Sequence, residues 1–131
     1  MRKRYKNPPI KGAPSEIADV LQSLQKELQV EINGYGEVVD YFLEFPDMLN
    51  LLLEMGYAIR EKFPDAKLVL KIYKDPEIDY EDLGFYIRYP SYDEELTNRL
   101  VEGIWEICEK FNDKIKDKEG FIAISTDFKP A

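Results

Sequence analysis

Two short runs of alternating apolar and polar residues do most to constrain the fold of this chain. They cover residues 67–74 and 83–89, and an acidic segment, 75–82, joins them. Strict alternation over several residues is typical of a β-strand that buries one face. Two such strands joined by a short polar loop predict an antiparallel hairpin. The apolar members of the runs are Leu68, Leu70 and Ile72, followed by Leu83, Phe85, Ile87 and Tyr89.

Three longer segments carry apolar residues at helical spacing. Helices are predicted over residues 16–30, 47–63 and 92–112. The third has the clearest beginning, because Ser91 and Glu94 form a capping box, in which a hydroxyl and a carboxylate satisfy the first free backbone amides.

The segment from residue 37 to residue 45 is open to two interpretations. Its β-branched and aromatic residues favour a strand, but a helix remains the alternative. A last strand is predicted over 121–128. With 37–45 as a strand, residues 37–128 follow the β-α-β-β-α-β order of the ferredoxin-like fold; without it, the sheet has three strands. Either way we predict an α+β fold over residues 15–131: an antiparallel sheet with helices on one face, preceded by an N-terminal helix.

Histidine is absent from the sequence. Its absence removes the commonest general base and the commonest metal ligand of proteins. The sequence also contains no phosphate-binding glycine motif and no nucleophile elbow. We therefore predict no catalytic residues, no metal and no cofactor, and a non-enzymatic role is preferred to an enzymatic one.

The formal net charge of −8 at pH 7 argues against a phosphate backbone as the main partner. Residues 1–14 differ from the remainder, since they include several basic residues and no acidic one. With three prolines and a glycine, this segment is predicted to be a flexible basic arm.

Several features predict a cytoplasmic protein. No apolar run reaches the roughly 18 residues that span a bilayer, and no apolar signal core follows the basic start. The one cysteine, Cys108, cannot form an intramolecular disulfide, which fits a reducing compartment. Abundant lysine, glutamate and tyrosine resemble the composition of thermophile proteins.

The predicted helix 47–63 has more apolar surface than one sheet face can bury. Besides its core stripe it carries Leu49, Leu53 and Tyr57, spaced by four residues and well away from that stripe. We expect this second stripe to be covered either by helix 16–30 of the same chain or by another subunit or a partner protein.

The predicted helix 92–112 shows the same surplus. Val101 and Trp105 lie outside its core stripe, and an indole in that position is covered by a neighbouring loop or belongs to an interface. Cys108 lies beside the core stripe and is predicted to be a small buried hydrophobe. The core stripe consists of Leu96, Leu100, Ile104, Ile107 and Phe111.

Two other functions fit parts of the sequence. Asp40, if it lies in a strand, would allow magnesium binding at a dimer interface, as in ferredoxin-like ribonucleases, which are metal-assisted phosphodiesterases. The far face of the sheet would offer aromatic and basic side chains to single-stranded RNA. The acidic segment 75–82 has the first carboxylates of a calcium loop but lacks its glycine and final glutamate, so a solvated loop is predicted. The far-face residues are Val69, Lys71, Tyr73, Tyr86 and Arg88.

The stretch from Phe45 to Glu95 resembles a group of small bacterial and archaeal proteins with no established activity. The shared features are a Phe-Pro pair before a leucine-rich helix, an Asp-Pro-Glu turn at residues 75–77 between two strands, and the helix start at residues 91–95. The resemblance implies a fold and a prokaryotic origin, and it implies no reaction.

These observations predict a non-enzymatic binding protein that self-associates through its surplus apolar helix surfaces, as a homodimer or with a protein partner. The metal-assisted phosphodiesterase and the RNA-binding sheet face are the alternatives. The predicted interface residues are Leu49, Leu53, Tyr57, Val101 and Trp105.

Overall fold

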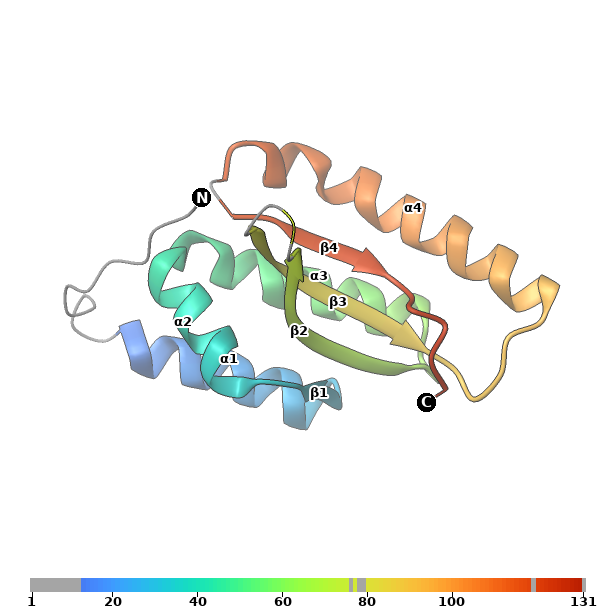
Figure 1. Cartoon of the computed structure of the whole chain (residues 1–131), viewed down its shortest axis with the longest axis horizontal. Coiled ribbons are helices and arrows are strands. Elements are labelled where there is room, and N and C mark those ends of the chain that lie inside the picture. Colours follow the sequence, from blue (N-terminus) through green and yellow to red (C-terminus); the bar gives the residue numbers. More distant parts are fainter. Residues whose placement is uncertain (1–12, 76, 78–79, 119, 131) are drawn as a thin grey trace.

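A computed structural model describes residues 13–75, 77, 80–118 and 120–130 of the chain (Figure 1). The predicted basic arm therefore lies outside the described residues, except for Ala13 and Pro14, which begin the first helix. The elements in chain order are α1 (Ala13–Glu27), β1 (Val30–Ile32), α2 (Tyr35–Glu44), the short 3-10 helix η1 (Pro46–Met48), α3 (Leu49–Lys62), β2 (Lys67–Asp75), β3 (Tyr80–Arg88), α4 (Glu94–Lys116) and β4 (Ile122–Ser125).

The predicted hairpin is confirmed and forms the centre of the sheet. Strands β2 and β3 pair antiparallel, with Leu68 opposite Ile87 and Leu70 opposite Phe85. The apolar members of both strands thus lie on one face, as the alternation predicts. The fold is α+β, with four helices and a four-stranded sheet.

The sheet is mixed, and the expectation of a wholly antiparallel sheet was wrong. The strand order is β1-β2-β3-β4, in which β1 lies parallel to β2 and β4 lies parallel to β3. Each outer strand reaches its place through a helical connection, and such a crossover brings in a parallel neighbour. From β1 to β4 the structure differs from the predicted β-α-β-β-α-β order, because α2, η1 and α3 all lie between β1 and β2. The two strands joined by each helical connection are also direct neighbours in the sheet. In the split ferredoxin-like arrangement another strand separates them.

The strand interpretation of residues 37–45 was wrong, because this segment forms α2. Its buried residues are Val38, Tyr41 and Phe42, followed by Phe45 at the helix end. These positions follow the i, i+3, i+4, i+7 spacing of a helix face, and a strand would have placed them on both faces of the sheet. The outer place in the sheet is taken by β1, which the sequence analysis did not predict.

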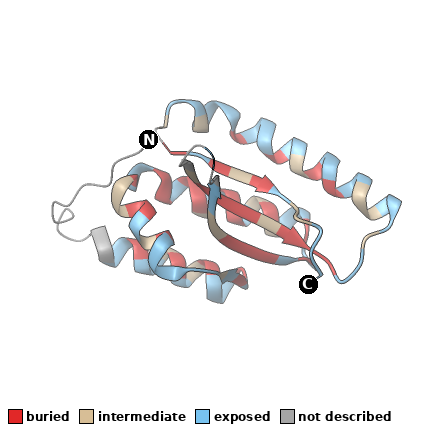
Figure 2. Ribbon diagram, in the orientation of Figure 1, coloured by how far each residue is buried: buried red, intermediate tan, exposed pale blue. Residues whose placement is uncertain are grey.

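One core holds the helices against the sheet (Figure 2). All four helices contribute buried residues to it, for example Leu21 of α1, Phe42 of α2, Leu52 of α3 and Leu100 of α4. The helices therefore cover one face, as predicted. The strand residues in the same cluster are Val30, Leu68, Leu70, Leu83, Phe85, Ile87, Ile122 and Ile124.

The longest helix begins later than the capping box predicts. Asp93 is its N-cap, and its carboxylate accepts a hydrogen bond from the backbone N–H of Leu96 at 2.7 Å. Aspartate is among the best N-capping residues, so Asp93 takes the place that was predicted for Ser91. In the part of the chain that the structure describes, no helix has both the length and the apolar composition needed to cross a membrane.

Candidate interaction surface

The outer face of α4 carries large apolar side chains in water. Val101 is 59% exposed and Trp105 is 61% exposed, although Leu100, Ile107 and Phe111 of the same helix are buried. Trp105 stands two residues from Ile107, and two residues correspond to about 200° around a helix. The indole therefore points away from the core, and the alternative that a loop of the described chain covers it does not hold.

Cys108 extends this apolar line and corrects a prediction. The residues Val101, Trp105 and Cys108 are spaced by four and then three, which places them along one side of the helix. Cys108 is exposed and is not the buried hydrophobe that the sequence predicted. Partial burial nevertheless raises the pKa of its thiol, so it remains in the neutral, apolar form at pH 7. We call these three residues the α4 strip.

The strip continues toward the sheet on one side. Ile104 and Ile115 are partly buried and pack against the core beside it. On the opposite side, Glu106 of α4 forms an ion pair with Lys62 of α3, and the ring of Phe63 lies against Gly103. The α4 strip therefore faces away from α3, along the margin where α4 contacts β4.

The second predicted stripe, on α3, is largely covered by the chain itself. Leu49 is buried, Leu53 is partly buried against the core, and Tyr57 is 46% exposed. The hydroxyl of Tyr57 donates a hydrogen bond to the carboxylate of Glu27 in α1. Of the two expected coverings, helix α1 of the same chain is thus the one found. Leu49 and Leu53 are not available as interface residues.

Helix α1 approaches α3 closely at Gly56. A Cβ atom at this glycine would come within 2.8 Å of a Leu24 methyl group and 3.2 Å of one from Leu28. Arg60 of α3 also donates from Nε to the carbonyl oxygen of Leu28 at 3.0 Å. Packing and hydrogen bonding together fix α1 on its own domain. Of the five predicted interface residues, Val101 and Trp105 on α4 and Tyr57 on α3 remain exposed.

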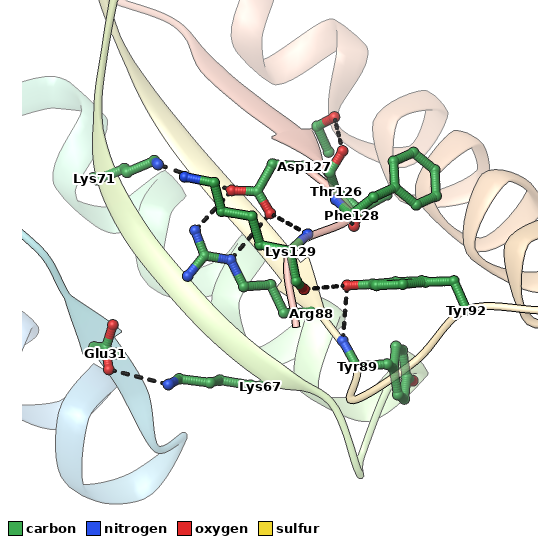
Figure 3. A network of polar contacts seen from close by, with 11 residues as sticks. Glu31, Lys67, Lys71, Arg88, Tyr89, Tyr92, Thr126, Asp127, Phe128 and Lys129 are labelled. Atoms are coloured by element: carbon green, nitrogen blue, oxygen red, sulfur yellow. Dashed lines mark hydrogen bonds and ion pairs between the residues drawn. The ribbon is translucent and has the colours of Figure 1, made fainter. Parts of the chain in front are cut away.

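The far face of the sheet is organised around an ion pair (Figure 3). Arg88 donates from Nε and Nη2 to the two carboxylate oxygens of Asp127, at 3.0 and 2.7 Å. Lys71 Nζ lies 3.9 Å from the same carboxylate and 4.7 Å from the centre of the Tyr86 ring. The hydrogen bonds from Arg88 hold the pKa of Asp127 at about 2. The basic groups that were considered for RNA binding are therefore already engaged by an acidic side chain.

Asp127 reaches this position because Tyr92 fixes the segment that follows β4 (Figure 3). The Tyr92 hydroxyl accepts from the backbone N–H of Tyr89 at 3.0 Å and donates to the carbonyl oxygen of Lys129 at 2.8 Å. Its ring packs edge-on against Phe128, with centroids 5.2 Å apart. The sequence analysis did not predict the ion pair between Arg88 and Asp127, although an arginine on the far face of β3 indicates that a carboxylate lies nearby.

A cavity of about 490 Å³ lies between the end of α3 and the first half of α4. The Tyr89 hydroxyl at its wall donates to Asp65 Oδ1 at 3.1 Å, and burial raises the pKa of Tyr89 to about 12. A phenol with that pKa stays protonated at neutral pH and makes a poor general base. Arg99 and Glu102 line the same cavity with opposite charges, so the cavity favours neither an anionic nor a cationic ligand.

The metal-assisted phosphodiesterase was an alternative interpretation of the sequence that depended on Asp40. Asp40 is exposed on α2 and not in a strand. Among the residues that the structure describes, no three or more His, Cys, Asp or Glu side chains come together as metal ligands. Three residues of the acidic segment 75–82 (positions 76, 78 and 79) lie outside the described chain.

Comparisons with protein families, with curated proteins and with solved structures found no match to this chain.

Proposed function

We propose that this chain is a non-enzymatic interaction protein that self-associates through the outer face of α4. The observation that carries the proposal is the exposure of Trp105 at the middle of a well-formed helix, with Val101 exposed one turn before it. Single exposed apolar residues are ordinary on protein surfaces. Here tryptophan, a residue enriched at interface hot spots, lies in line with two further apolar groups.

Burial of the α4 strip between two copies would stabilise a dimer. Burying a large apolar side chain stabilises a complex by about 1.5–3 kcal/mol relative to leaving it in water. A two-fold contact counts every such side chain twice, because the same patch is used by both copies. Because Val101 is 59% and Trp105 61% exposed, burying their exposed parts in both copies would contribute roughly 4–7 kcal/mol before the entropic cost of association is subtracted.

Analytical ultracentrifugation of the native chain and of the double variant Val101→Ser, Trp105→Ser tests the proposal. We expect the native chain to form dimers reversibly as its concentration rises, and the double variant to remain monomeric. Tyr73→Ser is the matched control, because Tyr73 is 47% exposed on the other side of the sheet. Its dimerisation should equal that of the native chain.

Two results would count against the proposal. A native chain that sediments as a monomer at millimolar concentration would remove it. So would a double variant that dimerises as well as the native chain while retaining the native thermal midpoint.

A further inference from the structure

Strand β4 is an outer strand of the sheet with its far edge open. It comes last in the strand order, and no described strand pairs with its outer side. In a parallel ladder every second residue directs both backbone groups to the neighbouring strand. The carbonyl oxygen of Phe121 accepts from Leu83 N at 3.2 Å, which gives Phe121, Ala123 and Ser125 that orientation. Ile122 and Ile124 therefore direct N–H and C=O outward, while their side chains lie in the core.

This edge lacks the charged side chains and prolines that commonly protect an exposed edge from pairing with another strand. Both edge strands are short, with three residues in β1 and four in β4. At the opposite edge the central residue of β1, Glu31, forms an ion pair with Lys67 at 3.3 Å. By contrast, residues 121–126 include no charged residue and no proline.

The open edge and the α4 strip belong to one side of the molecule. Helix α4 runs alongside β4 and contacts it (Figure 1). The strip lies on the side of α4 opposite Glu106 and Gly103, which contact α3 and its end. A partner strand on the edge of β4 would lie about 4.8 Å from it. A helix carried by that partner on the same sheet face would then lie on the side of α4 that carries the strip.

We infer that the partner is a second copy of this chain, which pairs its β4 antiparallel with β4 of the first, so that one sheet runs through both copies and the two α4 strips meet above it. The inference rests on the proposed self-association and adds its geometry. A two-fold axis makes the pairing antiparallel, and an antiparallel ladder of identical strands is complementary to itself.

The charges of α4 favour a second copy in this orientation. The first turn of α4 is acidic, with Glu94 and Glu95, and its last turn includes Lys116. Lys114 of the same turn points to α3, where it pairs with Glu54. The two-fold axis sets the two helices antiparallel, so the acidic end of each lies toward the basic end of the other. This complementarity offsets part of the repulsion between two chains that each carry a net charge of −8.

Amide hydrogen exchange, followed by NMR on the native chain below and above its dimerisation midpoint, tests the geometry. Where about nine-tenths of the chain is dimeric, exchange at Ile122 and Ile124 should slow about tenfold relative to the monomer, because it then requires dissociation. The amides of Ala123 and Ser125, which already face β3, are the internal comparison and should change less. Sedimentation of the same samples reports whether dimers are present.

Each combination of results has one meaning. Dimers with selective protection of Ile122 and Ile124 support edge pairing. Dimers in which these two amides exchange as fast as in the monomer overturn edge pairing and leave the proposed self-association standing. Absence of dimers at every concentration overturns both.

Discussion

The ring of Phe63 fills the space that a side chain at Gly103 would need. A Cβ atom at Gly103 would lie 2.5 Å from Cζ of that ring, closer than carbon atoms approach without displacement. Because Gly103 lies in α4 and Phe63 at the end of α3, this contact sets how closely the two helices pack.

Gly103→Ala should therefore destabilise the fold. Helix propensity alone predicts that alanine stabilises by about 1 kcal/mol, whereas overpacking costs about 1–3 kcal/mol. We expect the steric cost to exceed the gain in helix propensity, so the free energy of unfolding measured by urea titration should fall. Gly36→Ala in α2 is the matched control: nothing lies within 4 Å of its added Cβ atom, so this variant should be more stable. Equal stabilisation of both variants would contradict the packing.

Arg60→Met should lower stability by about 2–4 kcal/mol, since it removes four hydrogen bonds from a charged donor to backbone carbonyl groups, three of them part-buried, while keeping the side-chain length. Arg60→Lys should recover less than half of this loss, because one ammonium group cannot reproduce the guanidinium geometry. Chemical denaturation measures both, and a lysine variant as stable as the native chain would refute the role. The carbonyl acceptors belong to Leu28, Phe63, Pro64 and Ala66, at 2.7 to 3.2 Å.

The Arg88–Asp127 pair should make stability depend on acid pH. The pKa of Asp127 is lowered from 3.8 to about 2 in the folded chain. A depressed carboxyl pKa stabilises the fold above the unfolded pKa, and this stabilisation is lost as pH falls from about 5 to about 2. We expect native and Asp127→Asn chains to differ by on the order of 1–2 kcal/mol at pH 7 and to converge near pH 2. A difference that stays constant over this range would contradict the pair.

The raised pKa of Tyr89 should make stability depend on alkaline pH. Its pKa is raised from 10.0 to about 12, so the folded state favours the protonated phenol. The stabilisation is fully present below pH 10 and is lost as pH rises through 12. The pKa values of Tyr57 and Tyr86 are raised as well, but Tyr89 has the largest shift, so absorbance titration of tyrosinate should show its ionisation as the last step, and Tyr89→Phe should remove that step. Late ionisation that persists in Tyr89→Phe would assign the shift to another tyrosine.

The sequence predicted the elements whose signals are local. The β2–β3 hairpin follows from strict alternation, and both α3 and α4 follow from helical spacing with recognisable ends. Helix α2 was kept only as the alternative to a strand because residue preference was weighed above spacing, although Val38, Tyr41, Phe42 and Phe45 have helical spacing.

Other features depend on contacts between distant parts of the chain. Strand β1 has only three residues and exists because Val30 pairs with Leu68. The placement of α1 against α3 likewise depends on contacts between distant residues, such as those of Gly56 with Leu24 and Leu28. The sequence identified the surplus apolar surface, and the structure shows that Val101 and Trp105 are the two most exposed of its large apolar residues.

Fluorescence of Trp105 in the native chain tests the central claim most directly, because it is the only tryptophan in the sequence. With increasing protein concentration, we predict that its emission moves to shorter wavelength and that quenching by acrylamide weakens, both with the midpoint of dimerisation found by sedimentation. Emission typical of water and unchanged quenching across that midpoint would show that the outer face of α4 stays exposed, and would contradict the account.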